Sequence, residues 1–378
     1  MLNELKKLKK FNFKFKFKIP CQKDVLIFDN EGSDEILKYV IEENYDYYIY
    51  DTKKINIYLN IYFAITFFKN ILDKKIKASF IKKLYIVYIK SEIELMNPKL
   101  IMTYNDDNAI YHYIIPFLDN IRCMALQNGL RERFIRNRIK HRINHDYLYC
   151  FGENDIIKNR LDSWTSKQIV PIGSLRAGIA KSKFSNIEKL YDICILSEYE
   201  PRDKNSLDNH HWNDYWIILT EIMSQVQKKT DFNIIVARNG HGGNKEINYL
   251  RTMFDQNTSY SNPDKEFDSY KAILQSKLTI GFCSTLLAEA ISLNSRVLQL
   301  NTSNSNLYFD FDEVFIHHYE NNSNLIDKIR QLLDTPYHDY HSKINNFIPY
   351  YMNIDSQNLP QDYIKSQLTK MLTETQKC

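Results

Sequence analysis

Residues 277–290 read KLTIGFCSTLLAEA, and residues 295–301 read SRVLQLN. The first segment begins as a short apolar run that ends at Gly281, and its second half is compatible with a helix starting at Ser284 and Thr285. The second segment is another apolar run, so the order predicts strand, loop, helix and strand. Unpaired backbone N–H groups and the positive end of the helix dipole lie at such a helix start. The pattern therefore predicts a phosphate site at Ser284 and Thr285.

Glu289 lies one turn further along the same predicted helix. If Ser284 holds a phosphate of a nucleotide, the Glu289 carboxylate is within reach of the ribose hydroxyls. In the simpler interpretation, Ser284 is only a helix N-cap and Glu289 only a solvated helical residue. The residues alone leave both interpretations open.

Length and composition limit the class of protein. With 378 residues the chain is long enough for two domains that each bury a core. Charged residues make up 25% and the hydrophobic class 44%, which argues against wholesale disorder. The net charge of +4 is too small over this length to predict nucleic acid as a partner.

Cysteine usage and the start of the chain predict the compartment. The six cysteines are scattered, without a CxxC pair and without a histidine at ligand spacing. This pattern predicts reduced thiols in a cytoplasmic protein and no zinc site. Residues 1–18 carry cations but neither an uninterrupted apolar core nor a small-residue cleavage site, so no secretory signal is expected.

A basic aromatic arm, residues 1–20, alternates phenylalanine with polar residues over positions 11–17. A period of two places the rings on one side of an extended segment and the lysines on the other. Such a ribbon can lie on the anionic inner face of the cytoplasmic membrane, and it can equally be an edge strand or a frayed arm. Residues 57–72 are also apolar, but fall short of the roughly 20 clean residues of a membrane span. A packed or membrane-facing helix is predicted there.

Strand and helix patterns alternate through the rest of the chain, apart from a long helical region expected over residues 55–96. A linker at residues 175–190 separates two sets of strands. The expected strands are residues 24–28, 47–50, 99–103, 121–126, 147–151, 169–172, 192–196, 232–237, 277–281 and 296–301. This spacing predicts an α/β fold with doubly wound parallel sheets, whose ligands bind at the carboxyl ends of the strands. We expect domains at residues 21–177 and 178–350, and a C-terminal helix within residues 351–378.

The order of an apolar strand, Ser-Thr-Leu, two residues, Glu-Ala and a strand ending in Asn resembles the nucleotide-binding half of GT-B glycosyltransferases, particularly those that build bacterial surface polysaccharide. Residues 264–270, which lead into Ser284, are similar to the stretch before the donor helix in CDP-glycerol glycerophosphotransferases and related capsule proteins. Residues 101–108 and 126–131 resemble the N-terminal domain of surface carbohydrate biosynthesis proteins. The resemblance extends over most of residues 21–350. It implies the GT-B fold, in which two Rossmann-like domains face a cleft, the first binding the acceptor and the second the nucleotide donor.

By the same resemblance, Ser284 and Thr285 contact the donor phosphate and Glu289 contacts the ribose. Polar residues at the ends of two strands of the donor domain extend the predicted donor site. They are Ser197, Glu198, Arg238, Asn239 and Gly240. The implied co-substrate is a nucleotide sugar, with CMP-linked donors among the candidates, and neither a cofactor nor a metal is implied.

Arg238 and His241 leave the second strand of the donor domain toward the same cleft as Ser284. A guanidinium there can neutralise the leaving phosphate, and an imidazole can donate a hydrogen bond to it. Transferases that use CMP-linked acidic sugars commonly carry a His-Pro pair in this region, whereas Gly242 follows His241 here. A Gly-rich turn with an exposed Arg and His is the alternative interpretation.

Transfer also needs a base that takes the proton of the acceptor hydroxyl. Asp29 and Glu31 follow the first strand, where Kdo transferases carry a catalytic Glu beside a Gly, although in the order Gly-Glu. Asp107 is a second candidate, and each of these acids is alternatively a helix N-cap. The predicted acceptor-binding residues are Asn108, Gln127, Asn128, Gly129 and Arg131. The glycerophosphotransferases have His-Gly at the position of Asn128-Gly129, which counts against glycerophosphate transfer by the same chemistry.

Asp310-Phe311-Asp312 is a DxD sequence, but it lies far beyond the donor strand and is interpreted as surface, so no metal site is predicted. The sequence predicts a cytoplasmic GT-B glycosyltransferase, peripheral on the inner membrane face, that builds capsule, lipopolysaccharide or another bacterial surface polysaccharide. A CDP-polyol phosphotransferase using CDP-glycerol or CDP-ribitol is one alternative. The other is a non-catalytic protein of the same fold that binds a sugar nucleotide or a glycan.

Overall fold

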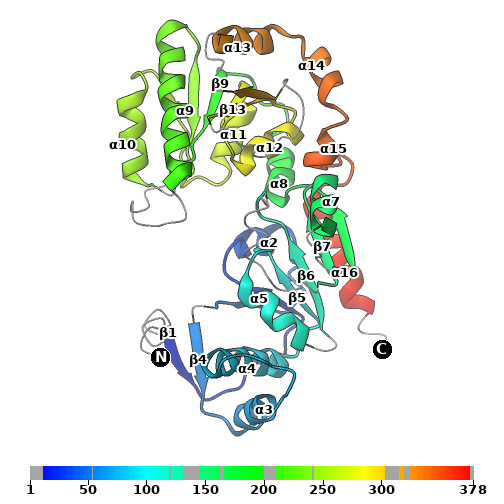
Figure 1. Cartoon of the computed structure of the whole chain (residues 1–378). Helices are drawn as coiled ribbons and strands as arrows, with labels where there is room; N and C mark the ends of the chain where they lie inside the picture. Colours follow the sequence, from blue (N-terminus) through cyan, green and yellow to red (C-terminus); the bar gives the residue numbers. More distant parts are fainter. Residues whose placement is uncertain are drawn as a thin grey trace. The chain divides into compact units, whose positions relative to one another are not determined.

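The computed structural model describes residues 12–52, 54–118, 121–130, 145–161, 166–199, 210–240, 242–302, 315–318 and 324–374. The chain divides into two compact units, which Figure 1 shows. Unit 1 comprises Met1–Leu175 and Asp355–Cys378, and unit 2 comprises Arg176–Ile354. The C-terminal helix α16 (Pro360–Glu374) therefore belongs to unit 1. Arg122 of unit 1 holds α16 in place, because its guanidinium donates hydrogen bonds to the Met371 carbonyl oxygen and to the Glu374 carboxylate.

Unit 1 contains a six-stranded sheet in which the described neighbours all pair in parallel. Its order is β3 (Tyr47–Tyr50), β2 (Val25–Phe28), β5 (Leu100–Thr103), β6 (Arg122–Leu126), β7 (Tyr147–Cys150) and β8 (Gln168–Pro171). The neighbouring strands β2 and β5 are buried along their whole length, which explains their apolar sequences. The order reverses between β2 and β5, so the topological switch point of unit 1 lies at the carboxyl ends of these two strands.

Helices pack on this sheet, and one of these helices is covered in turn by another helix. Besides α16, the helices among the described residues of unit 1 are α2 (Ser33–Tyr39), α3 (Ile61–Ile71), α4 (Phe80–Met96), α5 (Ala109–Ile114), the 3₁₀ helix η1 (Ile115–Phe117) and α7 (Glu153–Leu161). Helix α4 contributes Val87, Ile89 and Ile93 to the core beneath the sheet, and α3 packs on α4 (Figure 1).

The strands β1 (Asn12–Lys16) and β4 (Lys54–Tyr58) form a separate two-stranded parallel sheet. Part of the N-terminal arm is therefore an edge strand. The predicted helical region 55–96 is wrong at its start, because residues 54–58 pair with β1 and two helices follow. Glu92 of α4 fixes β4 by accepting hydrogen bonds from Tyr58 Oη at 2.6 Å and from Asn56 Nδ2 at 3.1 Å.

Unit 2 contains the second six-stranded parallel sheet. Its order is β11 (Ser259–Tyr260), β10 (Ile234–Ala237), β9 (Tyr191–Leu196), β12 (Ser276–Gly281), β13 (Arg296–Asn301) and β14 (Ile316–His318). Counted along the chain within this unit, the order is 3-2-1-4-5-6, which is that of Rossmann folds. The switch point lies between β9 and β12, which pair directly through Ile195 and Ile280.

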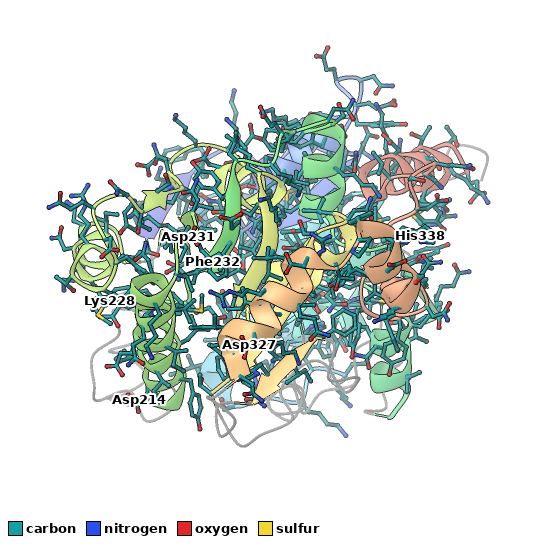
Figure 2. All side chains as sticks on the ribbon, turned by 90° about the horizontal axis from the view of Figure 1, so that it is seen from above. Asp214, Lys228, Asp231, Phe232, Asp327 and His338 are labelled. Carbon is teal, nitrogen blue, oxygen red and sulfur yellow. The ribbon has the colours of Figure 1, made fainter. Side chains whose placement is uncertain are left out.

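The structure describes these helices in unit 2: α8 (Leu175–Lys183, whose first residue belongs to unit 1), α9 (His210–Lys229), α10 (Asn244–Met253), α11 (Asp268–Leu274), α12 (Thr285–Ser292), α13 (Leu325–Asp334), α14 (Tyr337–Ile344) and α15 (Ile348–Tyr351). In Figure 2, Asp214 and Lys228 mark the two ends of α9, Asp231 and Phe232 lie at the entry to β10, and Asp327 marks α13. Helix α11 packs on β10 and β12, α12 on β12 and β13, and α13 on β12.

In the part of the chain that the structure describes, every helix is too short or too polar to span a lipid bilayer.

Candidate functional site

A loop at the switch point of unit 2 directs three backbone N–H groups at one carboxylate oxygen. The amides of Phe282, Cys283 and Ser284 donate to Oε1 of Glu198 at 3.0, 2.8 and 3.0 Å. The Cys283 thiol donates to the other oxygen, Oε2, at 2.9 Å. Glu198 follows β9 and the loop follows β12, so the adjacent pairing of these strands creates the contact.

The loop has the geometry of an anion site. Successive backbone amides before a helix N-terminus form a concave group of donors that binds phosphate or carboxylate. Although Glu198 as a residue is partly exposed, its carboxylate is enclosed by the loop. This enclosure raises the pKa of Glu198 above its ordinary value, and the hydrogen bonds from residues 282–284 act in the opposite direction. In this structure, the Glu198 carboxylate occupies the position that the sequence predicts for a donor phosphate.

The predicted helix start is confirmed at Ser284. Its Oγ accepts a hydrogen bond from the backbone N–H of Leu286 at 3.3 Å, and Thr285 is the first residue of α12. Glu289 is not the solvated helical residue of the simpler interpretation. It is 4% exposed and accepts a hydrogen bond from Tyr270 Oη at 2.9 Å. Its contact with a ribose stays a prediction.

Glu246 of α10 connects the loops after β9 and β10. It is fully buried, and its carboxylate accepts hydrogen bonds from Ser197 Oγ at 2.5 Å and from the backbone N–H groups of Asn239 and Gly240, each at 3.2 Å. Arg238 Nε lies 3.4 Å from Oε2 of Glu246, and Arg238 Nη2 donates to the Gly243 carbonyl oxygen at 3.0 Å. The guanidinium therefore pairs with a buried carboxylate of its own unit, which orients it at the end of β10.

Unit 1 gathers its predicted polar residues at its own switch point. The Glu31 carboxylate accepts hydrogen bonds from Asn105 Nδ2 at 2.9 Å and from Asn128 Nδ2 at 3.3 Å. Asn108 Nδ2 donates to Asp29 Oδ2 at 2.5 Å. These side chains come from the ends of β2, β5 and β6, which are neighbours in the sheet. Because Glu31 is exposed, its carboxylate is both positioned by two amides and accessible to a substrate.

The backbone around these side chains is tightly constrained. Gly32 has φ +67°, and a Cβ at this position would lie 1.9 Å from Cδ1 of Tyr104. Only glycine fits so close to the ring, which allows the Glu31 loop to pack on Tyr104. Asn128 is fixed by its N–H, which donates to Asp106 Oδ1 at 3.2 Å, and Gln127 Nε2 donates to the Gly129 carbonyl oxygen at 2.9 Å.

The structure separates the predicted residues into groups. Ser197, Arg238, Asn239 and Gly240 meet at Glu246, and Glu198 meets Ser284, whereas Asp29, Glu31, Asn108 and Asn128 meet in unit 1. Asp107 lies in the same loop of unit 1, between Asp106 and Asn108. His241, Arg131 and Asp310-Phe311-Asp312 lie outside the described residues.

Sequence reasoning missed two residues of these groups. Glu246 is the clearer case, since it stands in the first turn of a helix that follows a Gly-rich loop, where a carboxylate accepts backbone N–H groups. That position is the signal that could have identified it. Asn105 lies inside the motif after β5 but was not assigned a role, and only its contact with Glu31 distinguishes it.

Comparisons with known proteins agree with this architecture. A family model described as "putative O-antigen biosynthesis protein" matches residues 124–364. The wall teichoic acid polymerase TagF is similar in structure, with a TM-score of 0.55 and 14% identity over 94% of this chain and 90% of that chain. A UDP-GlcNAc 2-epimerase of Methanocaldococcus jannaschii, in complex with UDP-GlcNAc and UDP, has a TM-score of 0.52 and 13% identity over 93% and 99% of the two chains. A TagF variant soaked with CDPG gives a TM-score of 0.53 and 14% identity over 95% and 91%.

No curated protein matches the sequence. At sequence identities this low, the structural similarity shows only that the folds are alike. The α/β fold is GT-B, with two Rossmann-like units built on doubly wound parallel sheets, as the sequence predicts.

Proposed function

Because the chain belongs to the family of O-antigen biosynthesis proteins, we propose that it is a GT-B glycosyltransferase. It moves a sugar from a nucleotide-activated donor, CMP- or other NDP-linked, to a surface polysaccharide or a lipid-linked glycan. The observation that carries the proposal is the convergence of the N–H groups of Phe282, Cys283 and Ser284 on one anionic oxygen at the start of α12.

The donor nucleotide binds at the switch point of unit 2. Its phosphate takes the place of the Glu198 carboxylate, so Glu198 must swing out of the loop as the donor enters. Ser284 and Thr285 add hydroxyl contacts to the phosphate, and Glu289 holds the ribose. Arg238 contributes positive charge as the negative charge of the leaving phosphate develops. The proposed transfer uses neither a cofactor nor a metal.

The acceptor binds to the loops of unit 1, and Glu31 is the base we favour. It takes the proton of the acceptor hydroxyl while the oxygen bonds to the anomeric carbon and the bond to the donor phosphate breaks. Glu31 is favoured over Asp29 because it is exposed and held by two side-chain amides, whereas Asp29 also accepts from its neighbour's backbone N–H. Asp107 is the second candidate, and Asn108, Gln127 and Asn128 position the acceptor.

Two alternatives keep the same site. A CDP-polyol phosphotransferase is favoured by the likeness to a wall teichoic acid polymerase that has been soaked with CDPG. The Asn128-Gly129 pair, in place of His-Gly, counts against it. The second alternative is a non-catalytic protein, which would still have the amide loop but would no longer transfer a group to an acceptor.

We also propose that the protein works in the cytoplasm, on the inner face of the cytoplasmic membrane. A lipid-linked acceptor is presented there, and the lysines and phenylalanines of the N-terminal arm suit an anionic lipid surface.

Release of nucleotide tests the proposal. The purified protein is incubated with CMP-, UDP- and GDP-linked sugars and with CDP-glycerol, and the nucleotides are separated by chromatography. We expect the free nucleotide from one sugar donor above a protein-free control. CMP release from CDP-glycerol alone would identify the phosphotransferase, and tight nucleotide binding without release from any donor would make the chain a binding protein.

A further inference from the structure

Helix α3 exposes an apolar face that the described part of the chain leaves uncovered. Ile61, Ile65, Phe68 and Leu72 recur every three or four residues, so they share one face of the helix and its C-cap. They are between 60% and 77% exposed. We name these four residues the α3 stripe. A contiguous exposed apolar surface of this kind marks an interaction site.

The opposite face of α3 already has its partner. Phe63 and Asn70 are buried there, and Phe67 and Ile71 pack against the core cluster that α4 helps to form. The ring of Phe63 also packs against that of Tyr88 of α4 in a tilted arrangement, with ring centroids 5.8 Å apart. The stripe is therefore not the face that holds α3 in the fold.

The end of β1 extends the apolar surface toward the start of α3. The Leu59 N–H donates to the Lys16 carbonyl oxygen at 2.8 Å, and Asn60 Nδ2 donates to the Phe17 carbonyl oxygen at 3.3 Å. Asn60 is also the N-cap of α3. Phe17 and Leu59, at 73% and 54% exposed, thus lie beside the first turn of the helix.

The charged residues around the α3 stripe indicate which kind of partner it binds. Residues 52–91 carry nine lysines and one acidic residue, Asp73, and of these lysines Lys54 and Lys90 form ion pairs with Asp51 and Glu94. Lys69 lies on α3 and Lys74 follows shortly after its end. A second copy of the chain would bring these cations together from both sides, which is unfavourable. An anionic lipid surface instead neutralises them and accepts the apolar side chains between the head groups.

We propose that the α3 stripe, with Phe17 and Leu59, is the surface by which unit 1 docks on an anionic phospholipid bilayer. At eleven residues α3 is too short to span the membrane, so it lies in the plane of the interface. The proposal develops the membrane location proposed above and does not depend on the donor chemistry. It names folded side chains as the main anchor.

Vesicle binding tests the surface with matched variants of the whole chain. Ile65→Ser combined with Phe68→Ser removes the middle of the stripe, and Ile157→Ser makes the same change at an exposed isoleucine on α7, also in unit 1. Sedimentation is measured with vesicles of 70% phosphatidylcholine and 30% phosphatidylglycerol, and with pure phosphatidylcholine. We expect the wild type to bind the anionic vesicles, and the double variant to bind them roughly 100-fold more weakly, because two inserted side chains are lost. Ile157→Ser should bind like the wild type.

Lys69→Gln with Lys74→Gln should weaken the same binding by about five-fold per lysine, and 0.5 M salt should remove this difference. Thermal unfolding checks that each variant is folded, and nucleotide binding, which the proposed donor site predicts, should be unchanged in all of them. Equal vesicle binding by the wild type and the stripe variant would overturn the inference. So would a wild-type dimer in solution that the stripe variant converts to a monomer. Neither outcome would bear on the donor site.

Discussion

Glu31→Gln should lower the turnover number of sugar transfer by roughly 10²- to 10⁴-fold, the usual contribution of a positioned general base. Glutamine keeps the shape of the side chain but cannot take the acceptor proton. The donor dissociation constant should not change, because Glu31 belongs to unit 1 and the donor is assigned to unit 2. A transfer assay beside calorimetric titration of the donor measures both quantities.

Asp34→Asn is the matched control, since Asp34 is an exposed acid in the first turn of α2, close to Glu31 in sequence. It should transfer at the wild-type rate. Asp107→Asn distinguishes the second candidate, and if both Glu31→Gln and Asp107→Asn transfer at the wild-type rate, the base lies elsewhere. Loss of donor binding in either variant would contradict the assignment of these loops to the acceptor.

Glu246→Ala should lower the free energy of unfolding of unit 2 by about 3–5 kcal/mol, the usual cost of breaking a buried ion pair. The substitution leaves Arg238, whose side chain is 14% exposed, without its carboxylate, and leaves the N–H groups of Asn239 and Gly240 without their acceptor. Urea unfolding followed by tryptophan fluorescence measures the effect, because Trp216 is fully buried in α9 of this unit.

Glu221→Ala on α9 is the control for Glu246→Ala. Glu221 is exposed, so its removal should change the unfolding free energy by no more than about 0.5 kcal/mol. An effect of Glu246→Ala as small as that of the control would show that the carboxylate does not hold the loops after β9 and β10 together.

Local sequence pattern was sufficient to predict the six strands of the unit 1 sheet, four strands of the unit 2 sheet and the start of α12, but it missed the short strands β11 and β14. The strand predicted at residues 277–281 is β12 (Ser276–Gly281), and Ser284 is the N-cap. Because the carboxyl ends of neighbouring parallel strands meet, the polar residues after β2, β5 and β6 could be expected in one place, and Glu31 does contact Asn128. Their catalytic and binding roles stay predictions.

Contacts between distant segments could not be read from such patterns. Glu198 meets the loop before α12 across 84 to 86 positions of sequence, and only the adjacency of β9 and β12 brings them together. In the same way, residues 54–58 lie just before an apolar run that is compatible with a helix, yet they pair with β1 some forty positions away. In both cases the pairing of strands that are distant in sequence determined the structure.

The central claim is that a donor phosphate binds at the amide loop before α12. Isothermal titration of CMP, CDP, UDP and GDP tests it in the wild type, in the double variant Ser284→Ala, Thr285→Ala, in Glu198→Gln and in the exposed control Ser342→Ala of α14. We predict that one nucleotide binds the wild type and the control with 1:1 stoichiometry. The double variant should bind it more weakly by about 1–3 kcal/mol, since two hydrogen bonds to a charged phosphate are lost. Glu198→Gln should bind it more tightly, because the competing charge is gone. The same dissociation constant in all four proteins would contradict the claim and move the nucleotide away from α12.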